Sequence, residues 1–297
     1  MRRLLVLLAL LSTLGVAACG SDDSGAPSSG ARSLVQRALD TPVKSGRLDL
    51  KLGLRVAGVR ELADGVKLEL KGPFSSNGRA KLPSADLDLS AGGLGPGLGA
   101  GLVLTGDNAY VSFGGRAYEV GEDFVRELNS ESRRARGGRE SLEDFGIDPV
   151  RWIRAPEVAG HEEVAGTETT KVSGDVDVRR VLSDVAKLGG EVGSVAGRRP
   201  FDLTDADQRR IVEAVKKASI DLYVAGDGTL RRAVLDVRFE VPEEERRAAG
   251  GAEGGSAMLD LALSDVGEAQ HIEAPANARP LRELLEQFGL GPESFLQ

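Results

Sequence analysis

The residues whose types could support catalysis or metal binding are few and scattered. Cys19 is the only cysteine, so the chain can form neither an internal disulfide nor a site built from several thiolates. His161 precedes two glutamates but lacks the second histidine of a helical zinc motif, and His271 lies far from it in the sequence. The nucleophile elbow G-x-S-x-G is absent. The sequence therefore predicts no catalytic residue, no metal site, no cofactor and no enzyme activity.

Three local patterns resemble binding sites, and each has a simpler interpretation. Gly95–Ala100 matches the dinucleotide-binding fingerprint, but Leu102–Leu104 follows it as a strand where that motif needs a helix. Asp86 and Asp88 share one face of a strand and could serve calcium binding or acid–base chemistry, yet a solvated face is favoured because no oxygen-rich loop accompanies them. The arginines of Arg133–Arg139 could contact anionic lipid head groups, but neighbouring acids favour a solvated loop.

The one cysteine stands where a lipid-transfer reaction would use it. The basic start Met1–Arg3 and the apolar run Leu4–Leu14 have the form of a signal peptide, and the run is too short to span a bilayer. Val16–Cys19 is similar to a bacterial lipobox, whose cysteine thiol takes a diacylglyceryl group. An ordinary signal peptide with an incidental cysteine is the alternative. We expect residues 1–18 to be removed and lipid on Cys19 to hold an exported protein at the outer face of the cytoplasmic membrane.

The composition around this anchor is polar and acidic. Residues 19–30 contain the stretch GSDDSGAPSSG, which has nothing to bury and is predicted to be a flexible tether. Removal of residues 1–18 takes away Arg2 and Arg3 and no acid, so the net charge goes from −8 to −10. An acidic balance of this size argues against nucleic acid as a partner.

The rest of the chain, residues 31–297, is predicted to be one domain dominated by a β-sheet. Apolar and polar residues alternate strictly through Leu48–Val56 and Val66–Leu70, and again in Ile220–Val224, Val237–Val241 and Leu259–Leu263. This period of two is typical of strands with one dry and one wet face, as in antiparallel sheets. Gly-Asp turns at 106–108 and 226–228 predict hairpins.

A few helices are expected beside these strands. Thr204 followed by Asp207 predicts a helix start, from which Ile211, Val212 and Val215 continue. The other predicted helices cover residues 33–40, 121–132, 148–153, 178–188 and 280–288. The predicted fold class is therefore α+β: a curved antiparallel sheet, or half-barrel, covered by a few helices.

The helices could cover the apolar face of such a sheet completely or only in part. Complete cover by the helices would give an ordinary packed core, whereas partial cover would leave an apolar cavity able to hold lipid tails. The pattern alone does not choose between them. The candidate lining residues are Leu48, Leu50, Leu52, Leu54, Val56, Val66, Leu68, Leu70, Leu87, Leu89, Leu102, Leu104, Phe124 and Trp152.

The order of these parts resembles the LppX/LprG-like lipoproteins of actinobacteria, whose fold is related to the LolA and LolB lipoprotein carriers. Locally, the passage from Phe145–Pro149 through Trp152 to Val164–Val176 is similar to the family's helix, its G-x-x-x-V-x-G-x-x-T strand pair and its G-x-V entry into the next helix. Gly160, Val164 and Gly166 occupy corresponding places. The segments Gly92–Gly101 and Arg133–Arg139 have no counterpart in that pattern.

The resemblance implies a half-barrel around an apolar pocket that carries acylated lipids or glycolipids through the cell envelope without chemistry. The resemblance implies no catalytic residue in this chain. It assigns roles only to Cys19 and to the apolar faces of the strands. The alternative function is a structural or sensory envelope domain, in which the same sheet is fully packed and its surface binds a protein partner.

Overall fold

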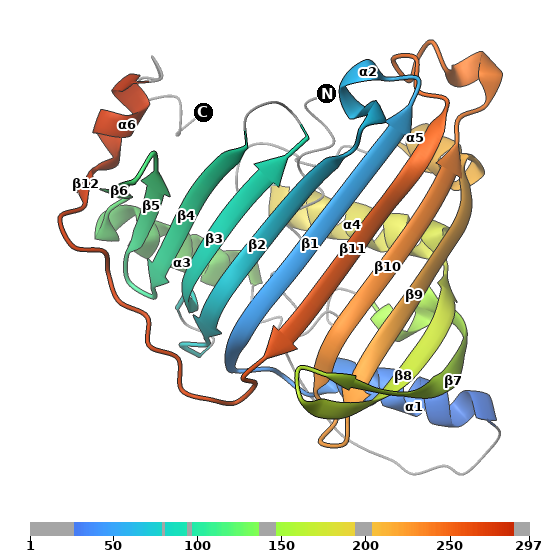
Figure 1. Cartoon of the computed structure of the whole chain (residues 1–297), viewed down its shortest axis with the longest axis horizontal. Coiled ribbons are helices and arrows are strands. Elements are labelled where there is room, and N and C mark those ends of the chain that lie inside the picture. Colours follow the sequence, from blue (N-terminus) through green and yellow to red (C-terminus); the bar gives the residue numbers. More distant parts are fainter. Residues whose placement is uncertain (1–26, 79–80, 94–96, 137–146, 194–203, 288–297) are drawn as a thin grey trace.

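A computed structural model describes residues 27–78, 81–93, 97–136, 147–193 and 204–287 of the chain. Twelve strands form one sheet in the order β12-β6-β5-β4-β3-β2-β1-β11-β10-β9-β8-β7 (Figure 1). Every pair of neighbours is antiparallel except β12 and β6, which are parallel. The predicted α+β class with a curved antiparallel sheet is confirmed.

The chain runs outwards from the middle of the sheet through β1 to β6, and then inwards from the opposite edge through β7 to β11. The N-terminal strands β1 to β6 form one half, and β7 to β11 form the other, so β1 pairs with β11 across a long stretch of sequence. Their bounds are β1 Ser45–Ala57, β2 Val66–Ser75, β3 Ser84–Gly92, β4 Leu98–Thr105, β5 Ala109–Phe113, β6 Arg116–Glu119, β7 Ile153–Val164, β8 Thr167–Val176, β9 Val215–Ala225, β10 Leu230–Glu240, β11 Gly254–Ser264 and β12 Arg279–Pro280.

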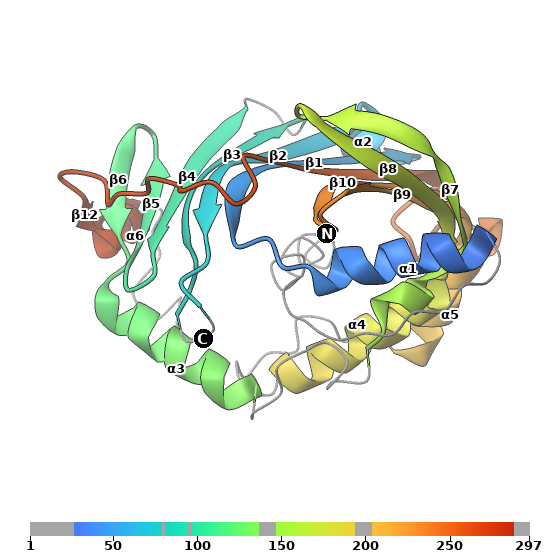
Figure 2. The same ribbon diagram turned by 90° about the horizontal axis from the view of Figure 1, so that it is seen from below.

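The longer helices lie on one side of the sheet. Figure 2 shows the sheet curved around the side on which α1, α3, α4 and α5 lie. The helices are α1 Pro27–Asp40, α2 Arg60–Ala63, α3 Glu122–Arg136, α4 Val178–Gly193, α5 Asp205–Ala214 and α6 Leu281–Gln287, with short 3-10 helices at Pro149–Trp152 and Glu243–Glu245. The concave side of the sheet is therefore the side that the helices cover.

The predicted helices are present, with shifted ends. Helix α1 begins at Pro27, where proline fits the first helical position, and so includes the last residues of the stretch expected to be a tether. Thr204 and Asp207 form the expected capping box of α5, but Val215 already belongs to β9. Helix α3 continues to Arg136, so the first residues of Arg133–Arg139 are helical rather than loop. Residues 1–26, including Cys19, lie outside the described part of the chain.

Helix α1 forms a closed core with one end of the sheet. Its Ala31 and Val35 are fully buried and pack with Val172 of β8 and Leu222 of β9. Val150 and Ile153 complete this cluster, so the 3-10 helix and the start of β7 are held in the same core. The apolar face is thus covered where it reaches β7–β9.

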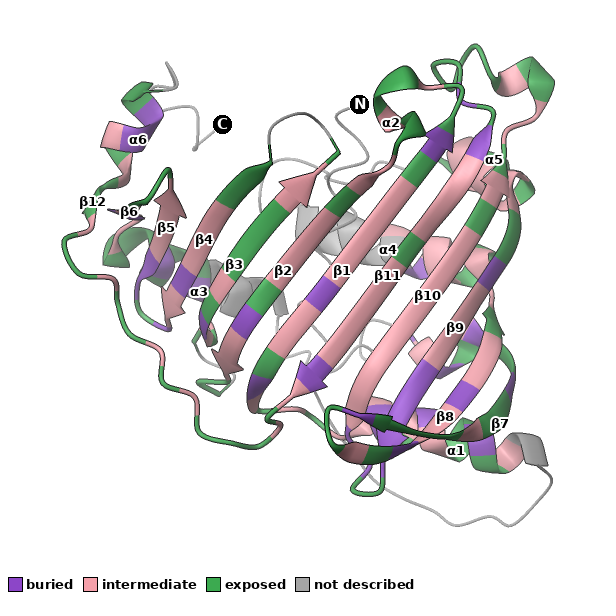
Figure 3. Cartoon of the chain, in the orientation of Figure 1, coloured by how far each residue is buried: buried purple, intermediate pink, exposed green. Residues whose placement is uncertain are grey.

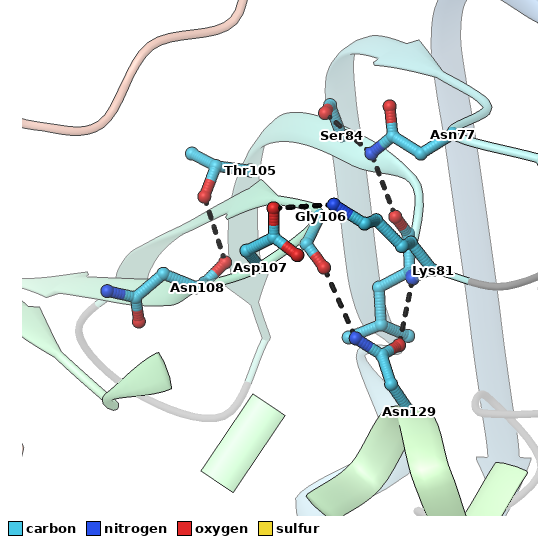
Figure 4. Close-up of polar contacts among 9 residues, drawn as sticks. Asn77, Lys81, Ser84, Thr105, Gly106, Asp107, Asn108 and Asn129 are labelled. Atoms are coloured by element: carbon cyan, nitrogen blue, oxygen red, sulfur yellow. Dashed lines mark hydrogen bonds and ion pairs between the residues drawn. The ribbon is translucent and has the colours of Figure 1, made fainter. Parts of the chain in front are cut away.

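Helix α3 is fixed to the other half of the sheet by one buried amide. The Asn129 side chain accepts a hydrogen bond from the Leu82 N–H at 2.9 Å and donates one to the Gly106 carbonyl at 3.3 Å (Figure 4). Leu82 precedes β3, and Gly106 starts the turn between β4 and β5. One side chain therefore connects α3 to two loops at the same end of the sheet.

Replacing Asn129 by alanine is expected to destabilise the fold by about 2 kcal/mol, because a partly buried N–H and a buried carbonyl lose their partner. Urea unfolding measures this loss. The control is Asn77→Ala, which removes two hydrogen bonds at an exposed position in the same region. Equal midpoints for the two variants would show that Asn129 does not anchor α3.

The turn between β9 and β10 contains a carboxylate that hydrogen bonds stabilise in its ionised form. Asp227 Oδ1 accepts from the Thr229 hydroxyl at 2.6 Å and from the Thr229 N–H at 2.9 Å. These hydrogen bonds, with a smaller contribution from Arg231, lower the pKa of Asp227 below its ordinary value. The turn is therefore stronger while Asp227 is charged.

The resulting stability is expected to be present above about pH 4, the ordinary pKa of aspartate, and to be lost as the pH falls through the lower folded-state value. Asp227→Asn should lose less stability than the wild type between pH 6 and pH 3. Urea midpoints at the two pH values measure the difference. The same drop in both proteins would show that this turn does not contribute to acid sensitivity.

Candidate functional site: the apolar concave face

Strand register aligns the predicted leucines into continuous apolar rows. In one row, each residue lies directly across from the next on nine neighbouring strands. The row is Val172, Leu222, Ala233, Leu261, Leu50, Leu70, Leu89, Ala100 and Phe113. A second row beside it contains Ile220, Leu235, Leu259, Leu52, Leu68, Ala91 and Leu98. The apolar surface is therefore shared by both halves of the sheet.

This surface faces the concave side. Val172 and Leu222, at one end of the first row, pack against α1, which lies on that side (Figure 2). Eight strand spacings of about 4.8 Å give the row a length of about 38 Å. The hydrocarbon core of a bilayer, in which two acyl chains meet end to end, is about 30 Å thick. The row is long enough for an extended acyl chain.

The charged residues of β1–β4 and β11 all occupy the alternating positions that face the other way. Lys71 lies between Asp88 and Asp49 in the register, and Lys51 lies between Glu69 and Asp260. Opposite charges in such cross-strand pairs stabilise a sheet. The hydrogen bond from Lys71 also lowers the pKa of Glu69. The convex face is thus polar and internally paired, while the concave face of these strands has no charged residue.

The residues of the apolar face differ in how far they are buried. Leu50, in the middle of the sheet, is only 6% exposed, whereas Leu89 is 36% and Leu98 62% exposed. Figure 3 shows mostly intermediate burial along β1, β10 and β11, with a buried stretch at the end of β9 beside α1. The face is packed by α1 at the β7–β9 end and remains partly open toward β3 and β4.

The register places the twelve predicted strand residues of the lining together on this one face. They are Leu48, Leu50, Leu52, Leu54, Val56, Val66, Leu68, Leu70, Leu87, Leu89, Leu102 and Leu104. Phe124 is 44% exposed on α3, whereas Val125 and Asn129 of the same helix are buried. Trp152 is half-buried and donates its indole N–H to Asp184 of α4 at 2.9 Å, so it joins the 3-10 helix to that helix. These two residues are not part of the strand rows.

Several residues of the face were not among the predicted lining. Leu235, Leu259 and Leu261 pair with the predicted leucines or with one another, and they recur with the period of two seen in β1, although Val234 and Met258 interrupt it. The pattern marked these segments as strands but not as partners of β1. The pairing of β1 with β11 adds them to the site.

A polar cluster on the convex face covers the other side of β9. The Tyr223 ring lies between the cations of Lys171 and Arg232, each 5.4 Å from its centroid. Arg232 makes a two-pronged contact with Asp260 at 2.8 and 2.7 Å, and the hydrogen bond to Asp221 raises the pKa of Lys171. Every charged member has an opposite charge beside it. The cluster is a cross-strand support for β8–β11.

Within the described ranges, no three histidine, cysteine, aspartate or glutamate side chains gather as a metal site would require. Asp86 and Asp88 lie on the solvated convex face, opposite the leucines of β3. In those ranges, too, no helix combines the length and apolar character needed to cross a membrane.

Comparison with known proteins finds similarity among solved structures. No family model matches the sequence, and no curated protein matches it. LprF from Mycobacterium bovis shares 16% identity at a TM-score of 0.45, covering 85% of this chain and 100% of LprF. The Mycobacterium tuberculosis lipoprotein LppX shares 13% identity at a TM-score of 0.41, and the match covers 82% of this chain and 99% of LppX. MucB, solved in complex with MucA(peri), shares 12% sequence identity at a TM-score of 0.28. The match covers 84% of this chain and 61% of MucB. LppX, after which the resembled family is named, is therefore among the solved structures similar to this chain.

Proposed function

We propose that this protein binds the acyl chains of lipids or glycolipids on the concave face of its sheet and carries them within the cell envelope. The observation that supports the proposal is the pair of adjacent apolar rows, the longer of which crosses nine strands. Helix α1 covers one end of this surface, and the surface stays partly exposed at Leu89 and Leu98. A fully packed sheet would bury these leucines.

Such a face needs no directional contact to hold a lipid. Each CH₂ group removed from water contributes about 0.8 kcal/mol, so an acyl chain of ordinary length gains enough from burial alone. The charges of β1–β4 and β11 lie on the convex side and do not oppose the chain. Acyl-chain binding of this kind requires no catalytic or metal cluster.

The proposal includes export and anchoring by lipid on Cys19. Two or more acyl chains on one terminus give stable membrane attachment, which a single chain does not. Bacteria that express the chain and are fed radiolabelled palmitate should yield labelled protein in the membrane fraction. Cys19→Ser should abolish the label. Equal labelling of both proteins would contradict the anchor.

Lipid binding is tested by measuring the lipid that remains bound to the purified protein. The full chain is extracted from a bacterial host that makes long-chain glycolipids, transferred to amphipols, and analysed by mass spectrometry after solvent extraction. Non-covalent lipid in a fixed ratio to protein is expected. Protein that repeatedly emerges without bound lipid, and takes none up when lipid is supplied, would refute the proposal.

A further inference from the structure

A hollow of about 300 Å³ lies where β8 ends and β9 begins, beside the starts of α4 and β7. Four basic residues contribute to its lining: Arg154, Arg179, Lys216 and Lys217. The whole chain has a net charge of −8, so a concentration of positive charge is not a general property of its surface. An anion is the ligand that such a lining attracts.

Two acidic residues, Asp175 and Asp177, also line the hollow beside its four basic residues. Asp177 accepts a hydrogen bond from the Arg180 N–H at 3.1 Å and so caps the start of α4. Asp175 lies directly across from Arg154 in the pairing of β7 with β8. Arg179 and Lys216 are both exposed, and neither forms an ion pair with another described residue. The Lys216 ammonium group donates one hydrogen bond, to the backbone carbonyl of Glu213 at 3.2 Å, which leaves its charge without a counterion among those residues. Their positive charge is available to a ligand.

The hollow adjoins the apolar concave face. Ala218 lines it and is also the cross-strand partner of Val237, which continues the apolar pattern of β10. Val215, another lining residue, pairs with Phe239 in the same way. The Phe239 ring in turn lies over Gly255 of β11. Apolar surface therefore leads from the sheet directly to the basic side chains.

We propose that this hollow binds the phosphate-bearing head group of the amphiphile whose acyl chain lies on the concave face. The inference rests on the proposed function, because it assigns a head-group class to the same ligand. A phosphate beside Arg179 and Lys216 gains charge-assisted hydrogen bonds, and the chain continues past Ala218 onto the leucines. The protein thus prefers an anionic lipid over a neutral lipid with the same chain.

The test compares two probes that share one acyl chain, oleoyl lysophosphatidic acid and monooleoylglycerol. The full chain in amphipols is titrated with each, and empty amphipols serve as the blank. The wild type is expected to bind the phosphate-bearing probe about tenfold more tightly or better. In Arg179→Ala/Lys216→Ala this preference should fall to about twofold or less, with monooleoylglycerol binding unchanged.

A control variant and a probe without an acyl chain distinguish head-group binding from acyl-chain binding and from binding of free phosphate. Arg55→Ala/Lys67→Ala removes the same charge from exposed positions on the convex face and should keep the full preference. Equal binding of both probes by the wild type would overturn the head-group inference but leave acyl binding intact. Failure to bind either probe would overturn both. Glycerol 3-phosphate that binds as tightly as the lipid would make the hollow a free-phosphate site and would also overturn the inference.

Discussion

Replacing Leu89 with glutamine is expected to weaken the binding of monooleoylglycerol by about 30-fold. Leu89 lies in the apolar row between Leu70 and Ala100, and it is 36% exposed. A bound chain that covers it gains about 2 kcal/mol from this side chain, and an amide in its place loses that gain. Titration of the purified variant with the radiolabelled lipid measures the effect.

The adjacent residue supplies the matched control. Ser90 belongs to the same strand and is exposed on the opposite face, across from Glu69. Ser90→Gln introduces the same side chain without touching the concave surface, so its affinity should remain within about twofold of the wild type. If both variants bind as tightly as the wild type, Leu89 is not part of the lipid surface.

The second large effect concerns stability. Val172→Ala should reduce the free energy of unfolding by about 2 kcal/mol, since it opens a cavity in the cluster that holds α1 to the sheet. Val172 is 1% exposed, while Val158, its partner across the β7–β8 pair, is 47% exposed. Val158→Ala should therefore change stability by no more than about 0.5 kcal/mol.

Urea unfolding of the two variants measures this contrast. The same side chain is shortened in each, on neighbouring strands, so differences in strand propensity cancel. Equal losses would mean that the cluster of α1, β8 and β9 is not a tightly packed core. Lipid binding offers a second measurement, because loosening α1 also exposes the end of the apolar row.

The sheet was predictable from sequence because its signal is local. Strict alternation in Leu48–Val56 sets both the strand and the face of every residue, and the register confirms that these leucines share one side with Leu68 and Leu89. The turns at Gly106 and Gly228 were equally local. The capping box of Thr204 and Asp207 marked the start of α5 for the same reason.

Long-range pairing was not predictable in this way. No property of Leu50 indicates that its neighbour is Leu261, more than two hundred residues later, because alternation recurs in several strands and does not identify their partners. Consequently the leucines of β10 and β11 were absent from the predicted site. Their position emerges only when the two halves of the sheet meet at β1 and β11.

Helix ends and faces depended on tertiary packing. Pro27–Gly30 contains no apolar residue, so the sequence favoured a tether, but the core around Ala31 and Val35 holds the helix from Pro27 onward. On α3, Phe124, Val125 and Leu128 were expected to share the apolar side, whereas the structure leaves Phe124 and Leu128 exposed and buries Val125 with the polar Asn129. The two loops that Asn129 bonds cannot be inferred from the helix alone.

Photo-cross-linking tests the central claim most directly. A fatty acid with a diazirine at the middle of its chain is bound to the full-length protein and activated by light, and the labelled residues are identified by mass spectrometry. We expect labels on the concave positions of neighbouring strands, such as Leu52, Leu68 and Leu259, and none on Lys51, Lys67 or Asp260 between them. Labels on the convex positions, or labelling that ignores this alternation, would contradict acyl-chain binding by the concave face.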